Sequence, residues 1–592
     1  MNKRIEIKVC TGIGGVAAGG EEVFSAFRDA LSSAGIEAAY GERCSAHRVG
    51  CKGFCARDVL VDIVINGDKT TYQYVKPEMV DRIIREHIVD GNPVADWVVG
   101  DDYEQYYEKQ QRVVLSGCGE ADPEDIDIYL KNGGFDALRK ALVEIAPEEI
   151  IATVKNSYLR GRGGAGFPAG LKWERSFRIK SDVKYVVCNG DEGDPGTFKD
   201  RALMEGEPYA IIEGMIICAK AVGSHSGYIY SRGAYTSSVR HLQTAIDKCY
   251  KKGLLGRDIL GAGFDFDLRL FKSAGAFVCG EATALLHTIE GKRGMPTPKF
   301  WSAAEKGLWD MPTVVNNVET FASIPGIILK GASWYKNLGI ENNGGTKVFA
   351  LTGKVKNTGL IEVRFGTSLR EIIFDIGGGI EGGRRFKAIH IGGPSGGCMS
   401  EESLDIEIDY EQIASAGAIM GSGGLIVLDE NDCIVNTAKF FLEFTQAESC
   451  GKCTPCRVGT KRMLEIMERI TAGEGREGDI ELLEELGHYI KATSLCGLGM
   501  TAPNPVLSTI RYFRHEYEAH VQGKKCPAAV CKSLITFTIL EDICKGCGSC
   551  KRVCPADAIR GIRKIPHRID PGLCIKCGSC FEVCKFKAIL KA

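Results

Sequence analysis

Hydrophobic positions recur with different periods along this 592-residue chain and divide it into segments. Apolar alternation at residues 5–9 and 59–65 predicts strands, and helical periodicity at 21–34 and 77–87 predicts helices, so residues 1–90 are expected to form a small α/β unit. Residues 91–145 are charged and tyrosine-rich, which predicts a linker that packs on its neighbours. The rest is expected to comprise a glycine-rich α/β domain at 146–335, a β-rich domain at 336–430, a helical domain at 431–525 and a cysteine-rich domain at 526–592.

Composition narrows the class of protein. The chain is 44% hydrophobic and 25% charged with a net charge of −2, which favours neither nucleic acid nor an anionic membrane as a partner. The longest apolar stretch, 209–222, is interrupted by Glu213 and Lys220 and is too short to span a membrane. No apolar signal core follows Met1, so we expect a cytoplasmic location. In that compartment, 25 cysteines at ligand-like spacings indicate iron–sulfur clusters rather than disulfides.

Two cysteine runs near the end share the spacing C-x2-C-x2-C-x3-C and lie about 30 residues apart. This is the spacing of two-cluster ferredoxins, in which the fourth cysteine of each run reaches the other cluster. A zinc site would need only four cysteines, usually in two separated pairs. The predicted [4Fe–4S] ligand sets are Cys544, Cys547, Cys550 and Cys584 for one cluster, and Cys574, Cys577, Cys580 and Cys554 for the other. Lys585 stands where the second run would carry proline.

A third cysteine group lies in the helical segment. Cys450, Cys453 and Cys456 share one short loop, and Cys496 follows forty residues later. Three thiolates in one loop plus one distant cysteine suit another [4Fe–4S] cluster, with a zinc knuckle as the alternative.

A glycine-rich loop, LRGRGGAGFP at 159–168, contains G-x-G-x-x-G. The preceding residues are predicted to be helical, so this is not the strand–turn–helix of a Rossmann fold. Its glycines, with Arg160, Arg162 and Lys172 beside them, suit a phosphate or dinucleotide held against backbone N–H groups.

An acidic turn, CNGDEGDPG at 188–196, follows a predicted strand at 184–187. Three carboxylates and an amide at a strand end are more typical of a functional site than of a solvated turn.

These two motifs resemble the FMN-containing, nucleotide-oxidising subunit of respiratory complex I. The resemblance continues through 275–281, 315–320, 449–453 and 494–497. The whole layout is similar to the β subunit of multimeric NAD(P)-linked [FeFe] hydrogenases, including electron-bifurcating ones. It implies a multidomain α/β fold: a thioredoxin-like N-terminal domain, a complex I-type FMN domain, a β-grasp-like domain, a helical [4Fe–4S] domain and a two-cluster ferredoxin domain.

The resemblance also implies residue roles. Phe167, Glu192 and Asp194 would face the nicotinamide nucleotide. The flavin would exchange electrons in pairs with the nucleotide and singly with the Cys450 cluster. The implied FMN residues are Gly161, Gly163, Lys172, Asn189, Asp191, Gly280, Glu281, Asn316, Asn317 and Thr320.

The nucleotide site departs from the family pattern. Ala282 follows Glu281 where a second glutamate is usual, and Ala234 also replaces a glutamate. Arg175 and Ser302 occupy positions where the family usually has phenylalanines that stack on adenine. Loss of carboxylates and gain of an arginine favour NADP(H), because the 2′-phosphate needs positive charge. NAD(H), or a degenerate site that binds neither, are the alternatives.

The N-terminal unit also departs from the cysteine pattern of the family. Cys10, Cys51 and Cys55 match a [2Fe–2S] pattern, but Gly15 occupies the second cysteine position. Cys44 is the predicted replacement, since four ligands are normally needed. A docking domain without a cluster is the alternative.

His520, Cys526 and Cys531 could supply three ligands of a zinc site, although a fourth is not evident from the sequence. A hinge with two free cysteines is the alternative. The remaining cysteines lack ligand spacing and are interpreted as packed small hydrophobic residues: Cys118, Cys188, Cys218, Cys249, Cys279, Cys398 and Cys433.

Together these features predict a flavo-iron–sulfur subunit of a multisubunit oxidoreductase that transfers electrons between NADP(H) or NAD(H), FMN and iron–sulfur clusters. No residue resembles a site of hydrogen activation, so a hydrogenase subunit is the expected catalytic partner, along with a small thioredoxin-like [2Fe–2S] subunit and ferredoxin. Electron bifurcation would suit such a complex. A diaphorase subunit of a formate dehydrogenase complex, and an electron-transfer scaffold with a degenerate nucleotide site, are the alternatives.

Overall fold

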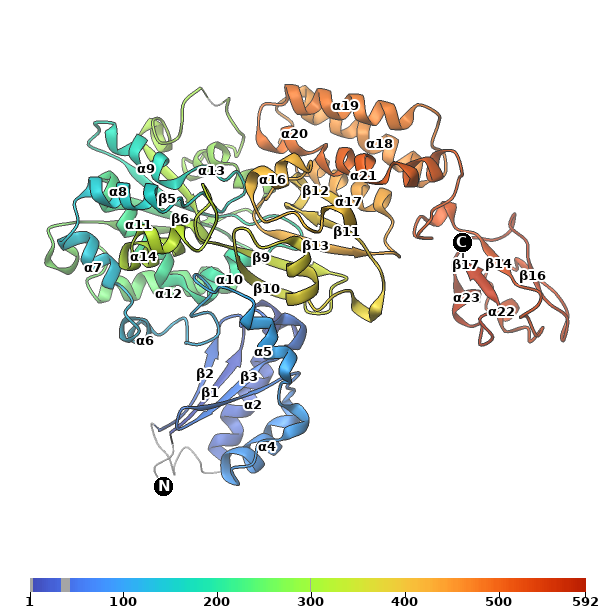
Figure 1. The fold of residues 1–592 in the computed structure, drawn as a ribbon, viewed down its shortest axis with the longest axis horizontal. Coiled ribbons are helices and arrows are strands. Elements are labelled where there is room, and N and C mark those ends of the chain that lie inside the picture. Colours follow the sequence, from blue (N-terminus) through green and yellow to red (C-terminus); the bar gives the residue numbers. More distant parts are fainter. Residues whose placement is uncertain (1–3, 34–42, 299, 592) are drawn as a thin grey trace. The chain divides into compact units, whose positions relative to one another are not determined.

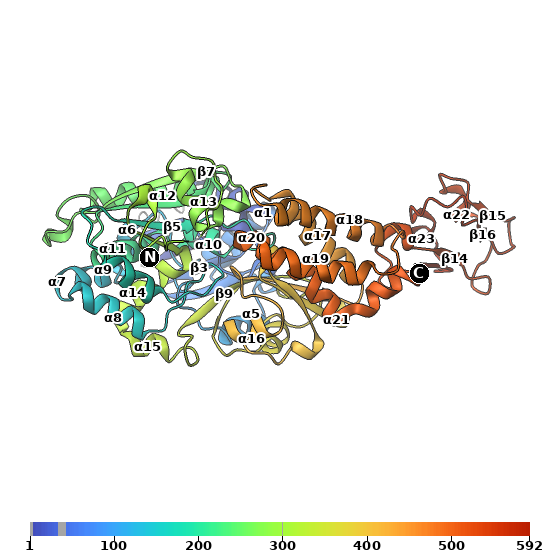
Figure 2. The same cartoon turned by 90° about the horizontal axis from the view of Figure 1, so that it is seen from above.

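The computed structural model describes residues 4–33, 43–298 and 300–591, and its chain falls into two compact units (Figures 1 and 2). Unit 1 comprises Met1–Arg384, Ile389–Gly396 and Glu402–Val427. Unit 2 comprises Arg385–Ala388, Gly397–Glu401 and Leu428–Ala592.

Unit 1 begins with a mixed sheet in the order β2-β1-β3-β4, drawn in blue in Figure 1. Strands β1 and β2 are parallel, and β3 and β4 are antiparallel to their neighbours. Ile5, Ile7 and Val9 alternate along β1 and are fully buried, so the predicted period marks the core face. Position 34 of the predicted helix at 21–34 lies outside the described residues. The elements are β1 (Ile5–Cys10), α1 (Ile13–Ala17), α2 (Gly20–Ser33), β2 (Cys44–Val49), β3 (Val61–Ile65), β4 (Asp68–Tyr72) and α4 (Val80–Ile83).

Residues 91–145 contain three α-helices, and buried carboxylates from elsewhere in unit 1 anchor parts of this segment. The Glu213 carboxylate accepts hydrogen bonds from the backbone N–H groups of Phe135 and Leu138, and Glu362 accepts from Val113 and Leu115. These bonds satisfy backbone groups that would be costly to bury alone. The helices are α5 (Asp101–Glu108), α6 (Ile126–Lys131) and α7 (Asp136–Val143).

A parallel sheet in the order β7-β6-β5-β8 forms the centre of unit 1. The apolar stretch at 209–222 forms helix α11, which is buried along most of its length and packs on α14, α7 and β5. Its lack of a polar face therefore reflects a central position in the core. The strands are β5 (Tyr185–Gly190), β6 (Ser226–Arg232), β7 (Asp267–Ser273) and β8 (Thr313–Asn317). The helices are α8 (Pro147–Asn156), α9 (Ala169–Arg178), α10 (Lys199–Gly206), α11 (Pro208–Val222), α12 (Thr236–Lys251), α13 (Ala282–Ile289), α14 (Val318–Lys330) and α15 (Ala332–Lys336).

A third sheet follows in the order β10-β9-β13-β11-β12. Residues 346–351 are all buried, which explains the apolar run at 348–351. The elements are β9 (Thr346–Gly353), β10 (Gly359–Arg364), β11 (Phe386–Ile391), β12 (Gly397–Ser400), α16 (Tyr410–Ser415) and β13 (Gly424–Asp429).

Unit 2 continues with a helical bundle and ends in a small duplicated domain, drawn in orange and red in Figure 1. In the tail each cysteine run has a short helix and a short strand on either side, so the sequence repeat is also a structural repeat. The strands pair between the two halves, β14 with β17 and β15 with β16. The bundle helices are α17 (Ile434–Ala447), α18 (Thr460–Thr471), α19 (Asp479–Thr493), α20 (Gly497–Thr501) and α21 (Asn504–Val521). The tail elements are β14 (Phe537–Ile539), α22 (Ser549–Arg552), β15 (Ile559–Arg560), β16 (Arg568–Ile569), α23 (Ser579–Glu582) and β17 (Ile589–Lys591).

Among the described residues, no helix combines the length and the hydropathy that a membrane crossing requires.

Candidate functional site

The carboxyl ends of two neighbouring parallel strands bring predicted flavin residues together. Strand β5 ends in Asn189-Gly190 and strand β8 ends in Asn316-Asn317. The pairing register sets Asn189 opposite Asn317. This edge of a parallel sheet is where ligands bind in open α/β folds.

The glycine-rich loop lies over this edge. The N–H of Arg162 donates to Thr320 Oγ1 at 2.9 Å, which ties the loop to the start of α14. A Cβ on Gly163 would come within 3.2 Å of Asn317 Cβ, so glycine allows the backbone to approach the strand end closely. Gly166 has a φ of +64°, and a Cβ there would meet the Tyr410 ring at 2.6 Å.

The two arginines of the loop are engaged by the protein itself. Arg162 is fully buried, and its guanidinium donates to the Gly344 carbonyl at 2.7 Å and to Tyr335 Oη at 3.2 Å. Arg160 donates to the Gly166 carbonyl and to Glu411. Both arginines therefore have partners within the protein, and these contacts shape the loop.

Lys172 and Asn316 provide polar groups at the same edge. The Lys172 ammonium on α9 donates to the Val315 carbonyl at 2.6 Å and to Asn316 Oδ1 at 3.2 Å. Asn316 is 3% exposed, and its Nδ2 has no hydrogen-bond partner within the part of the chain that the structure describes. A buried amide donor is costly to leave unpaired, so this atom fits a site that receives a polar ligand.

The acidic turn is stabilised by its own amides and by the segment before α13. Asn189 Nδ2 donates to the Gly280 carbonyl at 2.9 Å, and Asn189 Oδ1 accepts from the N–H of Asp191 at 3.1 Å. Glu281 caps α13 by accepting from the N–H groups of Thr283 and Ala284. Ala282 is the first residue of that helix.

Glu192 is directed into the protein. Its carboxylate accepts from the N–H groups of Asp200 at 3.1 Å and Arg201 at 3.1 Å, at the start of α10. Burial, and then the neighbouring Asp200 carboxylate, raise the pKa of Glu192 to about 8. In this structure the side chain is 4% exposed and does not face solvent.

The other residues predicted to face the nucleotide include Asp194, Phe167 and Arg175. Asp194 accepts a hydrogen bond from the Ser422 hydroxyl, and burial raises the pKa of Asp194 to about 6. Phe167 is 39% exposed, and the Arg175 guanidinium lies 5.1 Å from the centre of its ring. An exposed aromatic ring beside an arginine offers a stacking surface and a positive charge together.

Of the four N-terminal cysteines predicted as ligands, three lie near one another and Cys44 lies apart from them. Cys51 Sγ and Cys55 Sγ lie 3.8 Å apart, and Cys10 ends strand β1 close to Cys51. Cys44 pairs with Ile5 at the opposite end of the strand. Five residues of strand separate the two positions, or about 16 Å. The prediction of Cys44 as a replacement ligand is therefore wrong, and Cys44 belongs to the domain core.

In unit 2 the thiols of the central cysteine group influence one another. Burial raises the pKa of Cys456 to about 11, and nearby Cys453, Cys496 and Cys450 contribute to the rise. The Ser449 hydroxyl lies 3.2 Å from Cys456 Sγ. Mutual repulsion of this kind would be relieved by a cluster, which requires deprotonated thiolates.

Each half of the tail encloses a cavity lined by one of the predicted ligand sets. Cys544, Cys547, Cys550 and Cys584 line the first, with Ile539 and Phe586. The second is lined by Cys574, Cys577, Cys580 and Cys554, with Phe537 and Ile559. The fourth cysteine of each run thus reaches the other cavity, and apolar side chains shield both.

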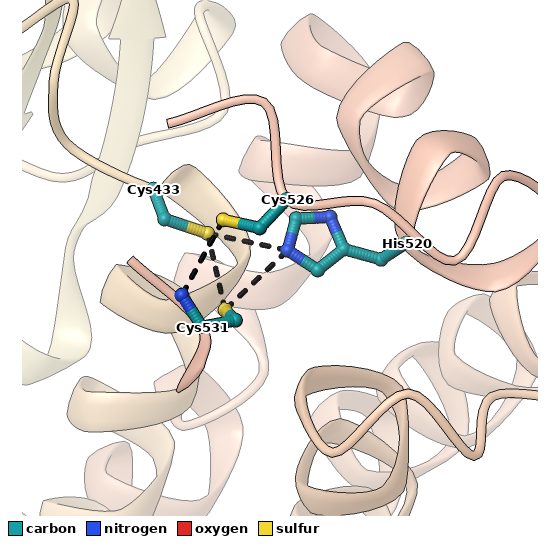
Figure 3. Close-up of side chains that lie close together, drawn as sticks. All are labelled: Cys433, His520, Cys526 and Cys531. Atoms are coloured by element: carbon teal, nitrogen blue, oxygen red, sulfur yellow. Dashed lines mark hydrogen bonds between the residues drawn. The ribbon is translucent and has the colours of Figure 1, made fainter. Parts of the chain in front are cut away.

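A further buried group joins helix α21 to the segments around it (Figure 3). Cys433, His520, Cys526 and Cys531 have ligand atoms that all lie within 4.8 Å of one another. His520 Nε2 is 3.4 Å from Cys433 Sγ and 3.4 Å from Cys531 Sγ, and the two sulfurs are 3.7 Å apart. These spacings suit the edges of a tetrahedron around zinc with bonds of about 2.0–2.3 Å. The other imidazole nitrogen bonds the Glu516 carbonyl at 2.7 Å, which orients the ring.

Cys433 is the fourth candidate ligand, which the sequence does not reveal. Cys433 is buried in the core of the bundle, as predicted, but its thiol also lies within the Cys3His group. It lies 87 residues before His520, and no local spacing connects the two.

The fold and these sites define a flavin- and iron–sulfur-binding oxidoreductase subunit. Profiles of known families match four parts of the chain: the Nuo51 FMN-binding domain at 154–326, an SLBB domain at 348–398, the iron–sulfur binding region of NADH-ubiquinone oxidoreductase F at 436–520, and a 4Fe-4S dicluster domain at 537–585.

Two relatives narrow the class. The NADP-reducing hydrogenase subunit HndC of Solidesulfovibrio fructosivorans is 54% identical over 483 residues, which cover 82% of this chain and 98% of the relative. The F component of the NADH-quinone oxidoreductase of Aquifex aeolicus is 44% identical over 416 residues, or 70% of this chain and 96% of the relative. The chain belongs to this family of NAD(P)H-dependent oxidoreductase subunits, which confirms the resemblance predicted from its motifs.

A solved structure extends the likeness to the fold. The crystal structure of an NAD+-reducing [NiFe]-hydrogenase in the H2-reduced state aligns with a TM-score of 0.61 at 28% identity. The alignment covers 88% of this chain and 85% of the hydrogenase chain, so the expected multidomain α/β architecture is confirmed.

Proposed function

We propose that this chain is the flavin-bearing, electron-transferring subunit of an NADP(H)-linked hydrogenase complex. Bound FMN would supply the conversion between hydride transfer and single electrons, which iron–sulfur clusters alone cannot perform. The observation that carries the proposal is the polar edge of β5 and β8 under the glycine-rich loop, with the buried Nδ2 of Asn316 and the ammonium of Lys172 beside it.

The chain's own groups suit the parts of FMN. The N–H of Gly163, with Lys172, would bind the phosphate, since cationic and backbone donors are strong partners for it. The N–H of Gly161 donates to the Phe167 carbonyl at 2.9 Å, so Gly161 would contribute by shaping the loop. Amides and carboxylates at the strand ends would bond the ribityl hydroxyls. The full proposed FMN set is Gly161, Gly163, Lys172, Asn189, Asp191, Gly280, Glu281, Asn316, Asn317 and Thr320.

The proposed nucleotide is NADP(H). Arg175 lies over the exposed ring of Phe167 and offers a guanidinium to a 2′-phosphate, while Ala282 removes a carboxylate that would repel it. Asp194 would contact the nucleotide from the acidic turn, and Glu192 would act from its buried position by fixing that turn on α10. HndC, described as NADP-reducing, supports this preference over NAD(H).

The iron–sulfur part of the proposal comprises three [4Fe–4S] clusters. Their ligands would be the central group with Cys450, Cys453, Cys456 and Cys496, and the two sets that line the tail cavities. A zinc ion would join Cys433, His520, Cys526 and Cys531 as a structural centre with all four positions filled by protein. The predicted domain boundaries, including a thioredoxin-like unit at 1–90 and a β-grasp-like one at 336–430, remain part of the proposal.

The proposed partners are the other subunits that a hydrogenase complex of this kind would need. A catalytic large subunit would carry hydrogen activation, and a small thioredoxin-like [2Fe–2S] subunit would complete the complex. The tail clusters would exchange electrons with ferredoxin in the cytoplasm, as electron bifurcation would require. A formate dehydrogenase partner would leave every feature of this chain unchanged, so copurification of the large subunit decides between the two.

The test measures flavin, iron and nucleotide-linked dye reduction on the full chain. We expect about one FMN per chain and faster dye reduction with NADPH than with NADH. Lys172→Ala should lose flavin, whereas Lys180→Ala, which removes an exposed lysine just beyond the same helix, should keep it. Bound FMN without reduction by either nucleotide would instead support an electron-transfer scaffold.

A further inference from the structure

Two thiols in the N-terminal domain lie together, and a third lies beside the same segment. Cys51 Sγ and Cys55 Sγ are 3.8 Å apart, which is the edge of a tetrahedron of thiolates around a metal with bonds of about 2.3 Å. Cys10 Sγ lies 3.8 Å from the carbonyl oxygen of Gly50, the residue before Cys51, so the third thiol is beside this segment. A [2Fe–2S] cluster needs four protein ligands.

The structure leaves no room for a side chain at Gly15, where the family pattern has its second cysteine. A Cβ on Gly15 would lie 2.2 Å from the Cys10 carbonyl oxygen and 3.1 Å from Cys10 Sγ, so the backbone would have to move to accept a side chain. Cys44 lies at the far end of β1 and β2. The missing ligand must therefore come from another element.

Asp58 occupies the space beside these thiols. A Cβ on Gly14 would meet Asp58 Oδ2 at 2.3 Å and Cys55 Sγ at 3.2 Å, so the carboxylate fills the volume that a side chain on the glycine segment would otherwise take. Asp58 Oδ1 accepts from the N–H of Leu60 at 3.4 Å, and Oδ2 is turned toward the cysteines.

The segment that carries these ligands is held in place. The Gly53 carbonyl, between Cys51 and Cys55, accepts from the N–H of Leu360 at 2.7 Å and from the Tyr106 hydroxyl at 2.9 Å. Such bonds fix the loop between the two cysteines before any metal binds, which is the support that a preformed site needs.

We propose that the thiolates of Cys10, Cys51 and Cys55 and the carboxylate of Asp58 form the ligand set of a [2Fe–2S] cluster. Cys51 and Cys55 would share one iron, and Cys10 and Asp58 the other. The inference extends the proposed electron-transfer function, and it explains how the domain keeps a cluster without a fourth cysteine. Replacement of a thiolate by a less electron-donating ligand raises the reduction potential, as histidine ligation does in Rieske centres.

The test is electron paramagnetic resonance of the reduced full chain at temperatures where [4Fe–4S] signals are broadened, together with iron content. The wild type should show a [2Fe–2S] signal. Asp58→Ala should lose both the [2Fe–2S] signal and about two irons per chain. Asp58→Cys should keep the signal, with shifted g-values and a lower reduction potential of the cluster. Cys44→Ser, and Asp68→Ala at an exposed position of the same domain, should leave it unchanged.

Flavin content and the [4Fe–4S] signals report whether each variant is folded, and NADPH-linked dye reduction tests the proposed function separately. A wild type without the [2Fe–2S] signal overturns the inference. So does a signal that Asp58→Ala leaves intact, one that Asp58→Cys does not shift, or one that is lost in Cys44→Ser.

Discussion

Removal of the Cys433 thiol should destabilise unit 2 far more than removal of another buried thiol. Structural zinc contributes about 10–16 kcal/mol to small metal-dependent folds, which is about 2.5–4 kcal/mol for each of four ligands. A domain of this size loses about 2–4 °C per kcal/mol, so Cys433→Ala should lower the unfolding midpoint of unit 2 by about 5–15 °C. Zinc content, measured by atomic emission, should fall from one ion per chain toward zero.

Cys398→Ala is the matched control, because Cys398 is fully buried in the same unit but lies outside the Cys3His group. Loss of one buried sulfur should cost about 1 kcal/mol. After zinc is removed by a chelator, Cys433→Ala should lower the stability of unit 2 by no more than Cys398→Ala does, because zinc then stabilises neither the wild type nor the variant. Retention of one zinc ion by Cys433→Ala, or equal midpoints for the two variants before chelation, would refute the metal site.

Three further substitutions test other parts of the structure. Arg175→Phe combined with Ala282→Glu should shift the ratio of kcat/KM toward NADH by roughly 10–100-fold, since a charge-assisted bond is worth about 1.5–3 kcal/mol; an unchanged ratio contradicts the role of the 2′-phosphate. Glu192 has a raised pKa, so the folded state binds more protons than the unfolded state between the ordinary glutamate pKa and about 8, and stability falls as pH rises through that window. Glu192→Gln should remove up to about 1.4 kcal/mol per pH unit of that fall in denaturant titrations, and an unaltered slope counts against it. Gly166→Ala should lose flavin and stability through both its positive φ and a clash with an aromatic ring. Gly223→Ala, at a left-handed φ of +73° with open space around it, measures the cost of φ alone, about 1–2 kcal/mol; equal stability losses in the two variants would show that the clash has no effect.

The sequence predicts those sites whose ligands are close along the chain or repeated. The tail cysteines are an example, because a fixed spacing within each run determines which thiols share a loop, and the duplication pairs the runs. The edge of β5 and β8 could also be anticipated, since each strand ends directly in the residues that carry the amides.

Features that depend on register or burial could not be predicted in this way. Cys44 and Cys10 look equally suited as ligands until the strand pairing places them at opposite ends of β1 and β2. Arg162 looks like a phosphate ligand because of its neighbours, yet it is buried to bond residues nearly two hundred positions later. Cys433 and Asp58 carry no motif at all, and only tertiary packing reveals their neighbours.

The contacts of the glycine-rich loop also have a consequence for biosynthesis. Gly161 accepts a hydrogen bond from the hydroxyl of Tyr410, 249 residues further along the chain, and Asp194 accepts one from Ser422. At a translation rate of roughly 5–20 residues per second, the loop leaves the ribosome roughly 12–50 s before these partners exist. During that interval the loop and the acidic turn lack these two hydrogen bonds, and a fragment that ends at residue 335 would lack them permanently.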